Sequence, residues 1–148
     1  MIKNDKRNKL IAPCGMDCGI CSHYLAYSHH FPKRKGVPQC IGCRERNKVC
    51  AFVKRDCELL RKNKINFCFE CKTFPCDNLK RIDKKYTDRY EMSFIANLIF
   101  IKEKGLNKFV QNQKRKYKCS SCGDTVCIHN NKCYTCDPII GGKTALSL

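Results

Sequence analysis

Residues 117–138 read YKCSSCGDTVCIHNNKCYTCDP, and this stretch carries the clearest structural motif of the chain. It contains two CxxC knuckles, at residues 119–122 and 133–136, with ten residues between them. A CxxC turn directs two thiolates at one ion, and two such turns complete the tetrahedral coordination that zinc prefers. The spacing is typical of a zinc ribbon. It predicts a zinc site made of Cys119, Cys122, Cys133 and Cys136.

The residues between the two knuckles have the pattern of a β-hairpin. Apolar and polar residues alternate over residues 125–129, which predicts a strand, and residues 132–134 would form the returning strand. Residues 130–131, both asparagine, tolerate the positive φ of a tight turn. Cys127 and His129 lie inside this hairpin. Because the knuckles already supply four ligands, we expect packing or surface roles for both.

The chain contains fifteen cysteines in 148 residues, and a disulfide framework is the first alternative to metal binding. Residues 1–20 include basic side chains but no apolar core followed by a cleavage site, so they do not resemble a signal peptide. An odd number of cysteines would also leave one thiol unpaired. Repeated CxxC spacing in a reducing compartment favours metal ligation. We therefore expect a cytoplasmic metal-binding protein.

The first upstream group of cysteines, at residues 14–21, has the spacing CxxxCxxC. This spacing also marks the iron–sulfur site of radical enzymes that cleave S-adenosylmethionine. Those enzymes need a large barrel of strands and helices, whereas here the cysteine clusters occupy most of residues 1–76. An iron–sulfur protein serving electron transfer or radical chemistry is nevertheless the alternative to a zinc protein.

The second group begins with a CxxC knuckle at residues 40–43 and continues into a helix predicted from Asn47 onward. Cys50 and Cys57 share the inner face of this predicted helix. Seven helical residues separate them by about 10.5 Å, whereas two sulfurs on one zinc ion are about 3.8 Å apart. They therefore serve different sites, or one is a buried thiol, and neither is assigned as a ligand. The third group occupies residues 68–76.

The favoured ligands are the cysteines of the closely spaced motifs. About three structural zinc ions fit this number of thiolates, and the spacing leaves open how the upstream cysteines divide between ions. The predicted metal ligands are Cys14, Cys18, Cys21, Cys40, Cys43, Cys68, Cys71, Cys76, Cys119, Cys122, Cys133 and Cys136.

Three upstream motifs follow one another in a specific order: CGMDCGIC at residues 14–21, CIGC at 40–43 and CFECKTFPC at 68–76. With the two cysteines between the last two motifs, this combination resembles the prokaryotic cysteine-rich family called domain of unknown function 3795. The resemblance covers residues 12–105. It implies metal binding and no assigned activity, and some members of that family extend into a C-terminal ribbon that residues 119–136 would match.

Three helices are predicted downstream of the upstream cysteines. Pro75 and Asp77 predict a helix start beside Cys76. Ser93 can cap a second helix of apolar residues, and Gly105 is a natural stop for it.

The third predicted helix spans residues 107–117 and has two interpretations. It is a connector that packs the ribbon onto the upstream module, or its basic end QNQKRKYK contacts phosphate. In the second case Tyr117 and Tyr134 would be available to stack on bases.

The charge and hydropathy of the chain limit its partners. The formal net charge is +17, and three four-thiolate zinc sites would lower it to about +11. This charge favours nucleic acid or another polyanion, with a protein as the other possible partner. No segment reaches the roughly 18 consecutive apolar residues of a membrane span, so no membrane insertion is expected.

These observations predict an α+β, small metal-stabilised protein. Its expected parts are a cysteine-rich helical module at residues 12–105, a helical connector at 106–116 and a zinc-ribbon β-hairpin at 117–137, flanked by tails at 1–11 and 138–148. The chain lacks a phosphate loop, a nucleophile elbow and an HExxH helix, which favours a non-enzymatic role. We expect a zinc-binding protein whose zinc sites are structural and which binds nucleic acid or another partner.

Overall fold

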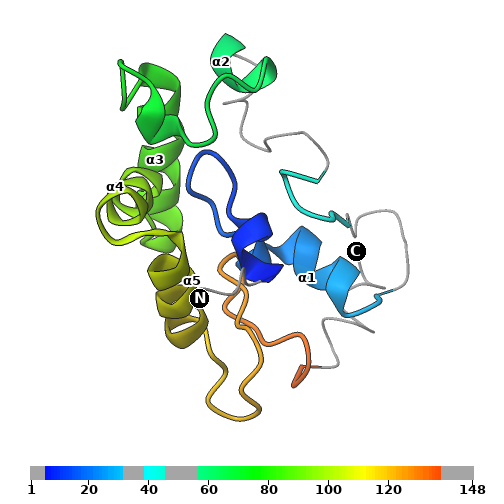
Figure 1. The fold of residues 1–148 in the computed structure, drawn as a ribbon. Coiled ribbons are helices and arrows are strands. Elements are labelled where there is room, and N and C mark those ends of the chain that lie inside the picture. Colours follow the sequence, from blue (N-terminus) through cyan, green and yellow to red (C-terminus); the bar gives the residue numbers. More distant parts are fainter. Residues whose placement is uncertain (1–5, 32–38, 46–56, 138–148) are drawn as a thin grey trace.

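The computed structural model describes residues 6–31, 39–45 and 57–137 of the protein. Short 3-10 helices and short α-helices form the first half, and three longer α-helices follow one another in the second half (Figure 1). The elements in chain order are η1 (Lys6–Leu10), η2 (Cys18–Ile20), α1 (Ser22–Ser28), α2 (Glu58–Arg61), η3 (Cys68–Glu70), α3 (Asp77–Tyr90), α4 (Phe94–Lys104) and α5 (Leu106–Lys116).

The prediction of an α+β fold with a C-terminal β-hairpin is wrong, because the fold is helical. Among the residues that the structure describes, no β-strand is present. The C-terminal segment contributes two isolated antiparallel bridges, which join Lys118 to Thr125 and Val126 to Cys133. Each bridge pairs a single residue with a single residue, so neither extends into a ladder.

Hydrogen bonds outside the expected hairpin explain why the bridges do not extend. The backbone N–H of Ile128 donates to the carbonyl oxygen of Ile20 at 3.0 Å, whereas the N–H of the preceding Cys127 donates within the segment to the Lys132 carbonyl at 2.9 Å. The N–H of Asn131, whose φ is 58°, donates to the carbonyl of Cys127 at 2.8 Å and closes a turn. An isolated two-stranded hairpin is marginally stable in water, and here docking on the helical core takes its place.

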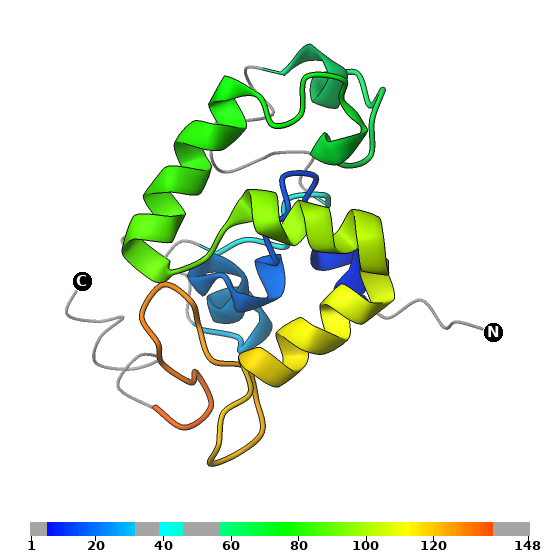
Figure 2. The ribbon, with the colours of Figure 1, turned by 90° about the vertical axis from the view of Figure 1, so that its left-hand side faces the viewer.

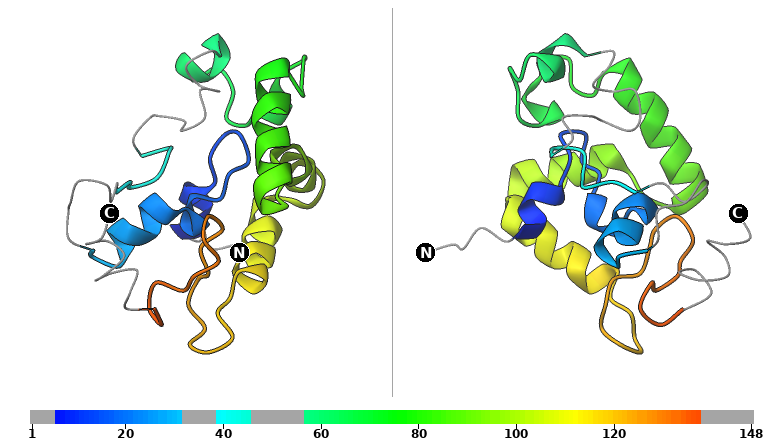
Figure 3. Two further views of the ribbon diagram at one scale, coloured as in Figure 1. Left: turned by 180° about the vertical axis from the view of Figure 1, so that it is seen from behind. Right: turned by 90° about the vertical axis from the view of Figure 1, so that its right-hand side faces the viewer.

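Helices α3, α4 and α5 lie on one side of the molecule, and the N-terminal segment packs behind them (Figure 2). Helix α1 extends away from this layer, as the view from behind shows (Figure 3). The C-terminal segment follows α5 and returns to the N-terminal part of the chain beside α1. This arrangement brings residues 128–129 into contact with residues 20–22.

The helix starts and stops that the sequence predicts downstream of residue 75 are confirmed. Cys76 is the N-cap of α3, as expected from the residues around it. The Ser93 hydroxyl accepts a hydrogen bond from the backbone N–H of Ala96 at 3.0 Å and caps α4. Gly105, with φ at 92°, ends α4 and immediately precedes α5. Local hydrogen-bonding chemistry is sufficient to place these boundaries.

A single main core joins elements from both ends of the described chain. Ile11, Leu79 and Leu98 are completely buried in it, and they come from the N-terminal segment, α3 and α4. Val110 of α5 and Ile128 of the C-terminal segment belong to the same cluster. Burial of these apolar side chains is the main term that stabilises the arrangement of the helices.

One buried carboxylate lies at the edge of this core. Asp17 is 1% exposed, accepts a hydrogen bond from the backbone N–H of Gly19 at 2.9 Å and forms an ion pair with Arg7 at 2.5 Å. Burial raises the pKa of Asp17, although Arg7 acts in the opposite direction. The ion pair fixes η1 against η2, and no sequence pattern indicated it.

Among the described residues, no helix combines the length and the apolar character that crossing a lipid bilayer requires.

Candidate metal centre

Four cysteine sulfurs meet at the C-terminal end of the described chain. The Sγ atoms of Cys119, Cys122, Cys133 and Cys136 all lie within 4.8 Å of one another. The Sγ atoms of Cys119 and Cys136 are 3.8 Å apart, and those of Cys122 and Cys133 are 3.5 Å apart, so both close pairs join one knuckle to the other. Cys119 and Cys133 are buried, whereas Cys122 and Cys136 are exposed.

The two knuckles have the same backbone closure. The N–H of Gly123 donates to the carbonyl of Cys119 at 2.9 Å, and the N–H of Asp137 donates to the carbonyl of Cys133 at 3.0 Å. Gly123 has a φ of 81°, a left-handed conformation that glycine adopts without a steric penalty. Each turn thereby directs two thiols toward the thiols of the other knuckle.

Backbone N–H groups compensate negative charge on these sulfurs. Hydrogen bonds from the N–H groups of Cys122 and Ser121 lower the pKa of the Cys119 thiol to about 6. The N–H of Asp124 donates to the Cys122 sulfur at 3.4 Å. A thiolate is the form of cysteine that binds a metal, so these contacts favour the charge state that ligation needs.

The donor set fits one metal ion. Sulfurs on a tetrahedral four-thiolate zinc are about 3.8 Å apart, which agrees with the separations between the two knuckles. The cluster could therefore hold a metal ion with all four positions occupied by protein ligands.

Asp124 connects this cluster to α1. Its Oδ2 atom lies 2.8 Å from Nε2 of His29 and accepts a hydrogen bond from the Thr135 hydroxyl, while Oδ1 accepts from the N–H of Thr125 at 2.7 Å. Burial acts to raise the pKa of Asp124, but the hydrogen bonds from Thr135, His29 and Thr125 hold it below its ordinary value. The Asp124 carboxylate, which follows the first knuckle, thus contacts both the second knuckle and the residue after α1.

Cys127 and His129 lie outside the four-sulfur cluster. Cys127 is completely buried in a small second core with Leu25 and Ala26 of α1 and with Tyr134. His129 is half-buried and is hydrogen-bonded to the N–H of Ser22. These positions agree with the packing roles expected from their place between the knuckles.

The cysteines at residues 14–43 lie in or beside the main core. Cys14, Cys18 and Cys43 are buried in it, and the N–H of Cys43 donates to the Cys18 sulfur at 3.5 Å. Cys40 is also buried, and its sulfur accepts the N–H of Gly42 at 3.3 Å. Cys21 is half-buried against the core.

The sulfurs of this upstream group do not form a second compact cluster. Apart from the C-terminal set, no group of three or more potential ligands in the described part of the chain has its ligand atoms within 4.8 Å of one another. None of the described cysteines forms a disulfide.

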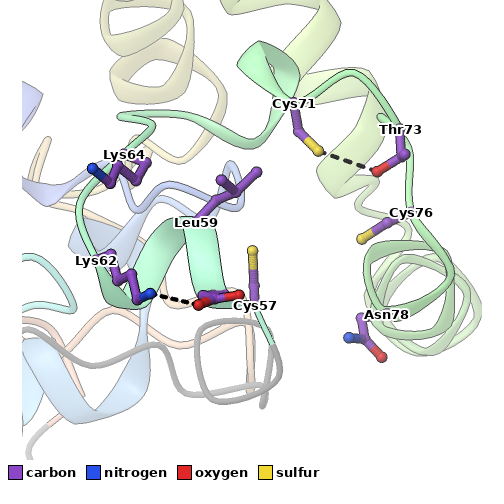
Figure 4. Close-up of a pocket in the computed structure, with 9 residues that line it drawn as sticks. Cys57, Leu59, Lys62, Lys64, Cys71, Thr73, Cys76 and Asn78 are labelled. Atoms are coloured by element: carbon purple, nitrogen blue, oxygen red, sulfur yellow. Dashed lines mark hydrogen bonds and ion pairs between the residues drawn. The ribbon is translucent and has the colours of Figure 1, made fainter.

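The third group of cysteines surrounds a cavity at the start of α3 (Figure 4). Cys71 and Cys76 line it together with Cys57, the residue before α2. Cys68 is buried and interacts electrostatically with these three thiols. Cys57 was left unassigned by its sequence spacing, and only the fold places it beside this group.

The other unassigned cysteine, Cys50, lies outside the described residues, and so does most of the helix predicted from Asn47. The prediction that Cys57 lies inside this helix is wrong, because Cys57 has an extended backbone and α2 begins only at Glu58 and ends at Arg61.

Arg44 is a functional candidate that sequence reasoning missed. Its Nε donates to the carbonyl of Ile11 at 2.6 Å, its two terminal nitrogens donate to the side chain and backbone of Asn66, and the guanidinium lies 4.7 Å from the centroid of the Phe67 ring. Burial lowers the pKa of Arg44, while neighbouring thiols, beginning with Cys14, oppose this shift. The signal in the sequence is a basic residue directly after a CxxC knuckle.

Comparison with known proteins supports the resemblance for the first half of the chain. Residues 10–81 match the family model described as "Protein of unknown function (DUF3795)". No curated protein and no solved structure matches the chain. The match does not extend to residues 119–136, so no family match confirms the ribbon-like segment. Over residues 10–81 the chain is thus similar to a cysteine-rich family whose function is unknown, and the C-terminal cysteine cluster that could hold a metal ion lies outside that similarity.

Proposed function

We propose that this chain is a zinc-binding protein in which the C-terminal cysteine cluster holds one structural ion. The observation that carries the proposal is the approach of four sulfurs from two knuckles to within 4.8 Å of one another. A structural zinc site uses four protein ligands, whereas a catalytic site keeps one position open for water or substrate. Four thiolates leave no open position, which supports a non-enzymatic role.

The upstream cysteines are proposed as ligands of further zinc ions, to a total of about three per chain. The division into a module at residues 12–105, a connector at 106–116 and a ribbon at 117–137 also stays a prediction. None of the described cysteines forms a disulfide, which suits a reducing cytoplasm, the location that we propose.

The test of the zinc proposal is elemental analysis of the full chain purified without oxygen. We expect about three zinc ions per chain and no iron. Replacing the exposed ligands separately, as Cys122→Ser and Cys136→Ser, should remove one zinc ion in each case, and the double variant should lose no more than one.

Cys127→Ala provides the matched control for these variants, because it removes a thiol that lies outside the cluster. It should retain the full zinc content. Iron with the visible absorbance of an iron–sulfur cluster would contradict the zinc proposal and support electron-transfer or radical chemistry. Unchanged zinc in the Cys122→Ser/Cys136→Ser variant would exclude the C-terminal cluster as the zinc site.

For the binding role, we propose nucleic acid as the partner, contacted through phosphate. Lys114, Arg115 and Lys116 are exposed on the last turn of α5, directly before the metal centre. Stacking of bases on Tyr134 does not agree with its position. Tyr134 is 8% exposed, and its ring stacks on Phe31 at a centroid separation of 5.2 Å. The basic end of α5 is therefore the feature that supports this role.

Salt dependence of binding tests this role. The chain should bind single-stranded RNA or DNA with an affinity that falls steeply as salt rises, and changing Lys114, Arg115 and Lys116 to Gln should lower the log–log salt slope by about 2–3. The matched control changes the exposed residues Lys80, Arg81 and Lys85 of α3 to Gln and should lower the slope less. Equal effects of the two triple variants would show that the attraction is a property of the net charge alone.

A further inference from the structure

Three cysteines line the cavity at the start of α3, and a fourth, Cys68, is buried near them. The cavity has a volume of about 460 Å³, and Cys57, Cys71 and Cys76 line it. Figure 4 shows the Cys57 and Cys76 side chains on opposite sides of the opening and Cys71 above them. Cys68 is 7% exposed and interacts electrostatically with all three of the other thiols.

The local backbone explains how these four residues come together. Cys68 and Cys71 are the ends of a CxxC turn, closed by a hydrogen bond from the Cys71 N–H to the Cys68 carbonyl at 3.1 Å. Cys76 is the N-cap of α3, and Cys57 is the N-cap of α2. Neither of these two cap residues makes a side-chain capping hydrogen bond, so their thiols are not used by the helix ends.

We propose that Cys57, Cys68, Cys71 and Cys76 form a second metal site, which binds one zinc-type divalent ion through four thiolates. The proposal rests on the proposed function of the chain as a metal-binding protein and deepens it by naming the ligands of one upstream ion. It assigns Cys57, whose role the sequence left open. Five predicted ligands then remain at residues 14–43, and one further four-coordinate ion would use four of them.

Ion binding at this site requires the cavity to close. The four sulfurs do not all lie within 4.8 Å of one another, whereas a tetrahedral ion holds thiolates about 3.8 Å apart. Rotation of the Cys57 and Cys76 side chains toward the cavity, with an approach of α2 to the CxxC turn, would bring the sulfurs together. The Cys71 sulfur lies 3.1 Å from the Thr73 hydroxyl, which can donate a hydrogen bond to a ligating thiolate.

Basic side chains around the cavity suit the charge of such a site. A divalent ion with four thiolates carries a net charge of about −2. Lys64 lines the cavity, and Arg44 interacts electrostatically with Cys68. Lys62 also lines it but is paired with Glu58 at 2.6 Å, so its charge is already balanced. Lys64 and Arg44 would offset part of the negative charge.

The test measures zinc retained by the full chain after anaerobic loading with Zn²⁺ alone, in competition with a chelating indicator. Cys57→Ser and Cys71→Ser should each lose one zinc ion, and the double variant should also lose only one, because both thiols bind the same ion. Combining Cys57→Ser with Cys122→Ser should remove two ions, because these residues serve different sites.

Two control variants distinguish ligand loss from a general disturbance. Asn78→Ala changes a residue that lines the cavity without removing a thiol, and Cys127→Ala removes a buried thiol elsewhere. Both should retain all zinc. Full retention of zinc by Cys57→Ser would overturn the second site while leaving the C-terminal site intact. Absence of metal from the wild-type chain would instead contradict the proposed function as a whole.

A measurement on the wild-type chain avoids the risk that a variant fails to fold. Alkylation followed by mass spectrometry should find Cys57, Cys71 and Cys76 protected in the zinc-loaded protein, and chelation should make all three reactive together. Reaction of Cys57 at the same rate with and without zinc, while Cys71 and Cys76 are protected, would overturn its assignment.

Discussion

At the residue scale, His129 shows how one side chain of the C-terminal segment joins distant parts of the chain. Its Nδ1 accepts a hydrogen bond from the Ser22 N–H at 3.2 Å, and its Nε2 lies 3.1 Å from the Tyr86 hydroxyl. The imidazole also meets the Tyr90 ring edge-on, with centroids 5.2 Å apart. Because Nδ1 is an acceptor, the ring is neutral with its proton on Nε2.

Protonation of His129 should weaken the folded state. Burial, and after it the nearby His23, lowers the pKa of His129 below 6.5. The unfolded chain therefore binds more protons than the folded chain in the window just below pH 6.5, and stability falls as the pH falls through that window. Urea unfolding at several pH values, with the metal content held constant, measures this effect.

A matched pair of variants assigns the pH dependence to His129. His129→Gln can keep one acceptor and one donor but does not titrate, so it should flatten the stability profile between pH 7 and pH 5. His30→Asn removes an exposed histidine at a φ of 57°, a conformation that asparagine tolerates, and should leave the profile unchanged. An equal slope in wild type and His129→Gln would place the titrating group elsewhere.

At the element scale, the packing of the N-terminal loop on α4 depends on one close approach. A Cβ atom at Gly15 would lie 2.9 Å from the carbonyl oxygen of Phe94 and 3.0 Å from Cγ of Leu98. Asn97 of α4 also donates a hydrogen bond from its side chain to the Gly15 carbonyl at 3.0 Å. The loop that carries Cys14 is therefore positioned by contact with the backbone of α4.

Adding a methyl group at Gly15 should separate the loop from α4. Gly15 and Gly105 both have a φ of 92°, but a Cβ at Gly105 would meet nothing within 4 Å. Gly15→Ala should therefore reduce the free energy of unfolding by about 1–3 kcal/mol more than Gly105→Ala, which suffers backbone strain without overpacking. Chemical denaturation of the two variants measures the difference. Equal losses would show that the contact with α4 contributes nothing beyond the strain.

At the scale of the whole molecule, the C-terminal segment is part of the helical core. Ile128 belongs to the same cluster as Leu98 of α4, and its N–H bonds to the Ile20 carbonyl. Cys127 and Tyr134 form the second core with α1. A metal ion between the knuckles would hold this segment in place and so stabilise the contacts between the two ends of the chain.

Chelation should consequently loosen the C-terminal segment before the three-helix layer. Removing an ion present at about 1,000 times its Kd should reduce stability by about 4 kcal/mol. In hydrogen exchange, the amide of Ile128 should lose protection on chelation, while amides in the middle of α4, such as that of Leu98, should retain most of theirs. Unchanged protection of Ile128 would mean that packing alone holds the segment.

Features that depend on neighbouring residues could be predicted from the sequence alone. The Ser93 cap and the Gly105 stop are correct because helix ends depend on local hydrogen bonds and backbone conformation. The meeting of the two C-terminal knuckles also followed from spacing, since a CxxC turn presents both thiols on one side. The expected hairpin between them failed because a short pair of strands is weak on its own.

Contacts between groups far apart in the sequence became apparent only in the tertiary fold. The Ile128 N–H bonds to the Ile20 carbonyl, and no spacing in the sequence predicted this contact. The spacing between Cys50 and Cys57 in the sequence did not indicate which cysteines lie near Cys57. In the fold, Cys57 lies across a cavity from Cys76. Local patterns do not predict contacts between segments far apart in the sequence, because burial of the shared apolar core determines how those segments pack.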